Sequence, residues 1–205
     1  MSKAFIYIHG KGGNAKEATH YAALLKEYDV IGLNYQSSTP WDAIEEFPIL
    51  FDRVKEKHDN VSIICNSIGA FFAMYTLAKK NIDTAYFISP IVDMEKLITD
   101  MLQWANVTEA ELCAKKEIPT SFGETLSWEY LCYVRNHPIN WQIPTLILYG
   151  DQDNLSSYQT ISNFANDRNA TLTVMHGGEH WFHTEEQMEF LDRWFMRYVS
   201  SKLFV

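Results

Sequence analysis

The sequence predicts an α/β fold, with a mainly parallel six-stranded sheet and helices on both of its faces. Two observations lead to this prediction. Short apolar runs of strand length alternate with segments of helical pattern along most of the chain. The alternation stops over residues 91–142, where the pattern is helical without a convincing strand. We therefore expect one domain, 1–205, that carries 91–142 as a helical insertion.

The first two strands and the helix between them are predicted from local signals. Residues 4–9 form an apolar run that glycines stop, which is typical of a buried strand. A helix is expected over 14–28, because Asn14 can cap it and Glu17 lies three residues on, as in a capping box. Residues 30–33 form the second predicted strand.

The next helix is predicted to begin at Thr39, which is followed by a proline suited to the first helical position. It should run to about Lys57, with a break or kink at Pro48, because proline removes a backbone donor. The same patterns predict strands over 61–65, 85–88, 145–149 and 171–175, and helices over 67–80, 94–104, 109–116, 127–136, 157–168 and 184–201.

Composition and charge exclude several classes of protein. The chain is 47% hydrophobic, enough for a sizeable core, and its net charge is −9 with no cluster of Lys and Arg. We therefore expect no nucleic-acid partner and no binding to anionic membrane surfaces, since both need clustered positive charge. The sequence does not indicate an oligomeric state.

The cysteines and the N-terminal region favour a cytoplasmic location. Cys65, Cys113 and Cys132 are few, odd in number and contain no CxxC pair, which argues against a disulfide framework and against a zinc site. The apolar run Ala4–Ile8 is too short for the core of a signal peptide or for a membrane span. We expect a soluble protein without membrane insertion.

A serine follows the third predicted strand and opens a helix. Cys65, Asn66, Ser67, Ile68 and Gly69 span this strand-turn-helix junction, the setting of a nucleophile elbow. The positions two residues from the serine must be small, because other backbone lies close to them. Gly69 meets this requirement, whereas Cys65 stands where glycine is usual. The alternative is that Ser67 only caps the helix.

Candidates for a base and an orienting acid follow two other strands. A serine nucleophile needs a base to take its proton, and that base needs a carboxylate partner. Asp151 and Asp153 follow the fifth strand, and His180 follows the sixth, with His176 and His183 as rivals. The order Ser, Asp, His places each group after a separate strand at the same edge of the sheet.

These motifs resemble those of the α/β-hydrolase superfamily, and most of all those of small bacterial hydrolases with a helical cap. The resemblance covers nearly the whole chain and is carried by residues 9–13, 66–69, 150–153 and 178–181. It implies a shortened core that lacks the first two strands of the family. It also implies Asp153 as the acid, with Asp151 as the fallback, and His180 as the base.

The glycine-rich segment 9–13 follows the first strand. By resemblance, the backbone amides of Lys11 and Ile68 form an oxyanion hole for the substrate. The alternative of a nucleotide-binding loop is poorly supported, because neither the phosphate-loop pattern nor the dinucleotide glycine pattern is present. We expect no cofactor and no metal.

The function predicted from these residues is that of a serine hydrolase acting on a small carboxylic ester or related acyl substrate. Ser67 would attack the carbonyl carbon and form an acyl-enzyme, with His180 as general base and Asp153 orienting it. A thioesterase, a peptidase, a C–C hydrolase or a lyase on the same scaffold stays open. So does a ligand-binding relative without catalysis, because Cys65 is unusual.

Aromatic residues are frequent in the insertion. They could line an apolar pocket for an acyl or alcohol group, or they could pack the insertion on the sheet, and their spacing does not separate these alternatives. They are Trp104, Phe122, Trp128, Tyr130, Tyr133 and Trp141.

Overall fold

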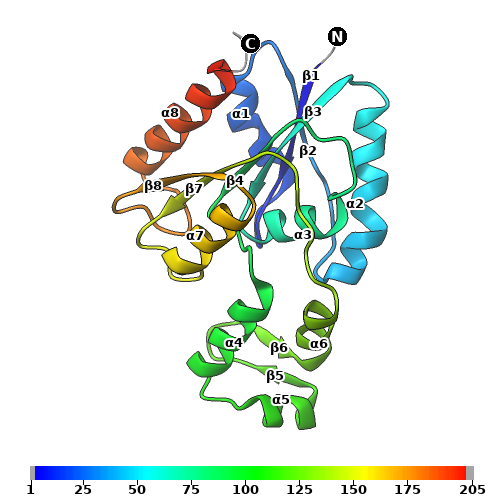
Figure 1. Cartoon of the computed structure of the whole chain (residues 1–205), viewed down its shortest axis with the longest axis vertical. Coiled ribbons are helices and arrows are strands. Elements are labelled where there is room, and N and C mark those ends of the chain that lie inside the picture. The colour runs from blue at the N-terminus through cyan, green and yellow to red at the C-terminus, as the bar shows by residue number, and fades with distance from the viewer. Residues whose placement is uncertain (1–2, 202–205) are drawn as a thin grey trace. The chain divides into compact units, whose positions relative to one another are not determined.

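The computed structural model describes residues 3–201, which form two compact units (Figure 1). The first unit holds the chain up to Val92 and from Trp141 onward, and the second is Asp93–Asn140. All six strands of the main sheet belong to the first unit. The second unit falls within the predicted insertion.

The main sheet is parallel throughout. Its strands are β1 (Lys3–Ile8), β2 (Asp29–Gly32), β3 (Asn60–Asn66), β4 (Ala85–Ile88), β7 (Thr145–Gly150) and β8 (Thr171–Met175). They lie in the order β2-β1-β3-β4-β7-β8. The direction of winding changes at β1, so β1 and β3 flank the switch point. Segments that follow these strands therefore meet at one edge of the sheet, where sites in such folds form.

Helices cover both faces of this sheet, which confirms the predicted fold class. Helices α1 (Ala18–Leu24) and α8 (Glu185–Ser201) lie on one face (Figure 1). Right-handed crossovers place α2 (Pro40–Lys55), α3 (Ile68–Thr76) and α7 (Tyr158–Asp167) on the other. Consecutive residues of a strand point to opposite faces of the sheet. Because the central strands are continuous apolar runs, both faces of the sheet are apolar. Phe5, Tyr7, Ile64 and Tyr86 contribute to the core beneath α1 and α8.

The segment between β1 and β2 begins as predicted but contains a shorter helix. Asn14 Oδ1 accepts from the Lys16 amide at 3.0 Å, and Glu17 accepts from the Asn14 amide at 3.0 Å, which confirms the capping box. The box caps a 3-10 turn (Ala15–Glu17) rather than the α-helix itself. Helix α1 ends at Leu24 instead of residue 28, because Leu25 leaves helical geometry and is buried in the core.

Helix α2 begins at Pro40 with Thr39 as its cap, as predicted, and runs to Lys55. It continues through Pro48, so the chain does not break there, and the alternative of a kink stays a prediction. Phe47 and Phe51 on either side of the proline are fully buried, and their packing holds the helix across one missing donor.

The second unit contains three helices and a hairpin. Helices α4 (Met94–Trp104), α5 (Glu109–Lys115) and α6 (Trp128–Asn136) agree with the expected ranges. Strands β5 (Glu117–Pro119) and β6 (Thr125–Ser127) pair antiparallel, so the expectation of helix alone was wrong here. Strands this short carry no readable alternation. Gly123, with a φ of 87°, makes the turn between them.

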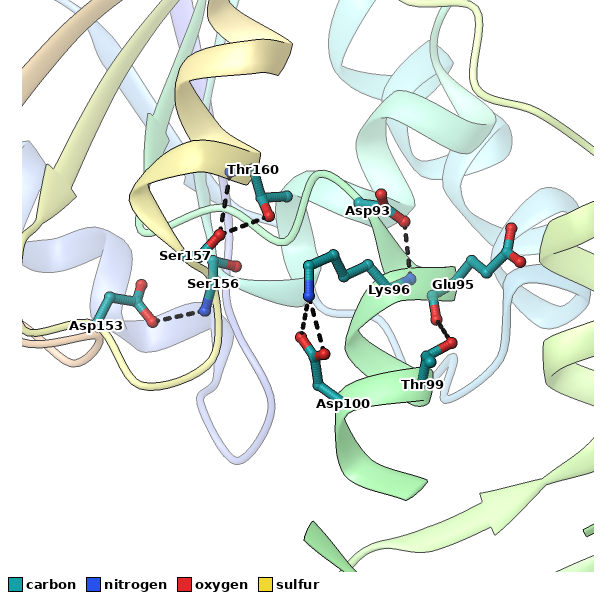
Figure 2. Close-up of polar contacts among 9 residues, drawn as sticks. All are labelled: Asp93, Glu95, Lys96, Thr99, Asp100, Asp153, Ser156, Ser157 and Thr160. Atoms are coloured by element: carbon teal, nitrogen blue, oxygen red, sulfur yellow. Dashed lines mark hydrogen bonds and ion pairs between the residues drawn. The ribbon is translucent and has the colours of Figure 1, made fainter. Parts of the chain in front are cut away.

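Polar contacts order the second unit from within. Asp93 caps α4 by accepting from the Lys96 amide at 2.9 Å, and the Lys96 side chain pairs with Asp100 (Figure 2). Arg135 on α6 binds Glu95 at 2.7 Å and Glu109 at 2.6 Å, which ties the three helices together.

The predicted aromatic residues of the insertion differ in environment. Trp141 is fully buried in the first unit, where its ring lies 5.7 Å from Phe87 and its indole N–H donates to Thr145 Oγ1 at 2.8 Å. Packing is thus the role of Trp141. Trp104 and Phe122 form an edge-on pair in the second unit, and both are exposed.

Candidate active site

Ser67 occupies a strained turn between β3 and α3. Its φ of 49° and ψ of −122° are rarely adopted by residues other than glycine. Backbone hydrogen bonds hold this turn: the Ser67 amide donates to the Ile88 carbonyl at 3.0 Å, and its carbonyl accepts from Ala70 and Ile91 at 3.1 Å each. The Ser67 side chain makes no capping hydrogen bond. The alternative that it only caps α3 is therefore wrong.

The residues two positions from Ser67 are small for different reasons. A Cβ atom on Gly69 would lie 2.4 Å from the His9 carbonyl oxygen, so only glycine fits there. Cys65 is fully buried in β3, and burial raises the pKa of its thiol well above the usual range. It is an uncharged core residue with a free thiol. A cysteine at this position is thus accommodated without loss of the turn.

Ser67, His180 and Asp153 form one hydrogen-bonded chain. His180 Nε2 lies 2.8 Å from Ser67 Oγ, and His180 Nδ1 lies 2.7 Å from Asp153 Oδ2. The carboxylate can only accept, so Nδ1 carries the ring proton and Nε2 is left to accept from the serine hydroxyl. The Asp153 side chain is fully buried, and that of His180 is 14% exposed. This is the geometry of a serine activated by a general base.

Asp153 is held by three donors. Besides His180, the amides of Leu155 and Ser156 donate to its Oδ1 at 2.8 and 3.0 Å, and Figure 2 shows the bond to Ser156. These donors compensate the burial of a charge and fix the direction of the carboxylate.

Two glycines bring the acid and the base together. A Cβ atom on Gly150 would lie 2.2 Å from the Gly178 carbonyl oxygen, so the ends of β7 and β8 approach at backbone contact. The Gln152 amide also donates to the Gly178 carbonyl at 2.8 Å. This contact places the Asp153 turn against the segment that carries His180.

The rival candidates have other partners, outside the chain of hydrogen bonds at Ser67. Asp151 binds His176 Nδ1 at 2.5 Å and accepts from the Gly177 amide at 2.8 Å. These bonds, that from His176 foremost, lower the pKa of Asp151. The His176 side chain is 97% exposed.

His183 lies against Trp181. The two rings stack with centroids 4.6 Å apart, and His183 Nδ1 donates to the Trp181 carbonyl. Asp153 and His180, not these residues, are the partners of Ser67.

The segment after β1 lies against the serine. A Cβ atom on Gly10 would come within 3.2 Å of Ser67 Cβ. Gly12 has a φ of 76°, and the Gly13 amide donates to the Gly10 carbonyl at 3.1 Å, which closes a tight turn. Lys11 lies within this turn, and Ile68 directly follows Ser67 at the start of α3. Their role as oxyanion donors stays a prediction.

A polar chain beneath the site was not predicted from the sequence. Asn66 Nδ2 donates to the Tyr7 hydroxyl at 2.9 Å, which itself donates to Glu17 Oε2 at 2.5 Å. Burial, and then the bond to Glu17, raises the pKa of Tyr7, so its phenol stays protonated. The chain links the residue before Ser67 to the segment after the glycine turn. The only signal for it in the sequence is Glu17 itself, for which the sequence predicts a capping role.

Two features are absent from the residues that the structure describes. Between residues 3 and 201, no three His, Cys, Asp or Glu side chains are grouped so that they could hold an ion. Over the same residues, no helix combines the length and the apolar character that a membrane crossing requires.

Comparison with known proteins gives structural relatives only. No family model and no curated protein matches the sequence. Est1E from Butyrivibrio proteoclasticus has a similar structure, with a TM-score of 0.77 and 16% identity over 100% of this chain and 89% of its own. Alpha/beta hydrolase domain-containing protein 10 from mouse gives a TM-score of 0.76 and 16% identity, covering 98% of this chain and 90% of its own. An esterase from Pyrococcus furiosus gives a TM-score of 0.63 and 19% identity, covering 96% of this chain and 82% of its own. The chain has the α/β-hydrolase fold.

Proposed function

We propose that this chain is a serine hydrolase that cleaves a small carboxylic ester or a related acyl substrate. The observation that carries the proposal is the chain of hydrogen bonds from Asp153 through His180 to Ser67. It combines a nucleophile, a base and an orienting acid, which are the groups that acyl-transfer chemistry needs. The fold of the esterase from Pyrococcus furiosus supports the ester class by analogy.

The proposed reaction has two halves. Ser67 Oγ attacks the carbonyl carbon while His180 Nε2 takes its proton, and the carbonyl oxygen becomes an oxyanion next to the amides of Lys11 and Ile68. The bond to the leaving group then breaks, and that group receives the proton from His180. Water attacks the acyl-enzyme, gives a proton to His180, and releases the acid as the proton returns to Ser67. Asp153 stays ionised and stabilises the charged His180 throughout.

Labelling with a fluorophosphonate probe tests the proposal. We expect covalent labelling of the wild type and none of Ser67→Ala. Ser162→Ala, in a half-buried serine of α7, is the matched control and should label like the wild type. A wild type that is folded but does not label would overturn the enzyme proposal in favour of a ligand-binding protein. Labelling that survives Ser67→Ala would overturn only the assignment of the nucleophile.

A second measurement addresses the substrate. Hydrolysis of nitrophenyl esters of rising acyl length should show a preference for one length, since the depth of an acyl site limits what it binds. Turnover of thioesters or peptides in preference to all of these esters would move the proposal to another reaction on the same scaffold.

A further inference from the structure

Tyr35 holds the turn after β1 from the side of α2 and α3. It follows β2, is 6% exposed, and its ring stacks on that of His9 with centroids 4.2 Å apart and planes 12° apart. Its hydroxyl donates to the His9 carbonyl at 2.7 Å. Behind it, the rings of Phe47 and Phe72 lie 4.8 and 6.3 Å away and limit its movement. Burial raises the pKa of Tyr35, so the hydroxyl keeps the proton that it donates.

The bonds around His9 determine where two amide protons point. A trans peptide is planar, so its C=O and N–H point in opposite directions, and fixing one fixes the other. The His9 carbonyl, held by Tyr35, shares a peptide with the Gly10 amide. The Gly10 carbonyl shares a peptide with the Lys11 amide and accepts from His9 Nδ1 at 2.8 Å and from the Gly13 amide at 3.1 Å. The ring that Tyr35 stacks upon thus directs the Lys11 N–H.

This turn is in contact with the reacting serine. A Cβ atom on Gly10 would meet Ser67 Cβ at 3.2 Å and the Asn66 carbonyl oxygen at 3.5 Å. The His9 carbonyl oxygen packs against Gly69. A Cβ atom on Gly69 would lie 2.4 Å from this oxygen. The turn therefore has little room to shift as a unit, but its peptides could still rotate without the bonds to Tyr35 and His9.

We infer that Tyr35 is a positioning residue for the reaction, which holds the turn so that the Lys11 amide faces the oxyanion formed at Ser67. This inference rests on the proposed function, because an oxyanion forms only if Ser67 attacks a carbonyl. Tyr35 acts through the backbone of 9–11 and not on the substrate. Its contribution should therefore appear in the transition state and not in ground-state binding.

Tyr35→Phe tests the inference by removing one oxygen atom while keeping the stacked ring. Loss of a whole oxyanion donor costs about 10²–10³ in kcat, so loosening one should cost about tenfold, with KM changed by less than about twofold. An alkylboronic acid, which forms an anionic tetrahedral adduct with a serine hydroxyl, should bind the variant more weakly by the same factor. A purely structural effect would not link kcat to boronate affinity in this way.

The matched control is Tyr86→Phe, a buried tyrosine that packs beneath α8 on the other face of the sheet. It should leave kcat, KM and boronate affinity at wild-type values. His9→Phe is a second variant, which keeps a ring for the stack but removes the Nδ1 donor, and it should reproduce the loss even if Tyr35→Phe does not fold. Thermal melting of each variant shows that it is folded.

The outcomes separate the two proposals. A wild type that neither hydrolyses esters nor reacts with fluorophosphonate would overturn the proposed function and this inference with it. An active wild type with unchanged kcat in folded Tyr35→Phe would overturn only the inference, and so would unchanged kcat in folded His9→Phe if Tyr35→Phe does not fold. A raised KM at unchanged kcat, or a loss of kcat without loss of boronate affinity, would also overturn it.

Discussion

Two carboxylates that are two residues apart have different environments in this molecule. Asp153 is buried and accepts from His180 and two amides, whereas the Asp151 carboxylate lies nearer the surface and binds the exposed His176. Only Asp153 is connected to Ser67 through a histidine. The two residues therefore differ in their hydrogen-bond partners and in burial. Substitution of each aspartate by asparagine, which replaces one carboxylate oxygen, tests this difference.

Asp153→Asn should lower kcat by up to about 10⁴-fold, because an amide favours the wrong tautomer of His180 and cannot stabilise its charged form. Asp151→Asn should leave kcat near the wild-type value. Ester hydrolysis under saturating substrate measures both. An equal loss in the two variants would contradict the assignment of Asp153 as the acid.

Asp151→Asn should instead change how stability depends on pH. The pKa of Asp151 is lowered in the folded protein, so its bonds stabilise the fold above the unfolded pKa, which is about 3.9 for aspartate. That contribution is lost as the pH falls through the lower folded pKa. Urea unfolding should show the variant less stable than the wild type at pH 7, with the difference shrinking toward pH 3. A difference that grows on acidification would contradict this account.

The candidate site was predictable from the sequence as far as its side chains follow strands. Ser67, Asp153 and His180 were identified by motif, chain order and resemblance. Tyr35 and Tyr7 were not, because their partners lie 26 and 59 residues away along the chain and no local pattern joins them. A ring stack or a buried hydroxyl bond depends on tertiary packing, which single-residue patterns do not encode.

At the scale of elements, glycines determine how closely strand ends approach. A Cβ atom on Gly150 would lie 2.2 Å from the carbonyl oxygen of Gly178 and 2.3 Å from its carbonyl carbon. Both are backbone atoms, so neither can move without displacing the segment that carries His180. This close approach of the segments after β7 and β8 allows the short side chain of Asp153 to reach His180.

Gly150→Ala should therefore separate Asp153 from His180. A displacement of about 1 Å at a reacting group costs about 10²-fold in kcat, and the overpacking should lower the free energy of unfolding by about 1–3 kcal/mol. Gly123→Ala is the control, since it strains a turn of the second unit in which a Cβ meets nothing within 4 Å. It should lose stability but not kcat. Equal kinetics in the two variants would contradict the role of the Gly150 contact.

The elements themselves were predicted best where apolar runs are long or bounded by clear signals. Strands β4 and β8 and helix α4 have the expected limits. The hairpin of β5 and β6 was missed because each strand has three residues. The predicted length of helix α1 is too great. The residues of its last predicted turn are typical of a helix, but Leu25 is buried in the core and ends the helix.

At the scale of the whole molecule, the residues of the site all belong to the first unit and to one edge of its sheet. Alternating strands and helices predicted a parallel sheet, but the order β2-β1-β3-β4-β7-β8 does not follow from periodicity. That order depends on which strands pair, and so on contacts between distant segments. It is what brings the segment after β1 beside the serine after β3.

The core beneath α1 and α8 supports the sheet from the face opposite Tyr35, so it should affect stability without affecting chemistry. Phe195 in α8 is fully buried, and its ring lies within 5.1–5.8 Å of those of Tyr86, Tyr21 and Phe5. Phe195→Ala should lower the free energy of unfolding by about 3–5 kcal/mol, because it leaves a cavity among rings that cannot collapse. Urea unfolding measures the loss.

Below the unfolding transition, kcat of Phe195→Ala should equal that of the wild type. Tyr7 belongs to the same core, but its hydroxyl is held by Glu17 and Asn66, so the cavity should not reach Ser67. Ile49→Ala, at a 56% exposed position of α2, is the control and should change stability by less than about 0.5 kcal/mol. A fall in kcat of fully folded Phe195→Ala would show instead that this core transmits strain through Tyr7 to the serine turn.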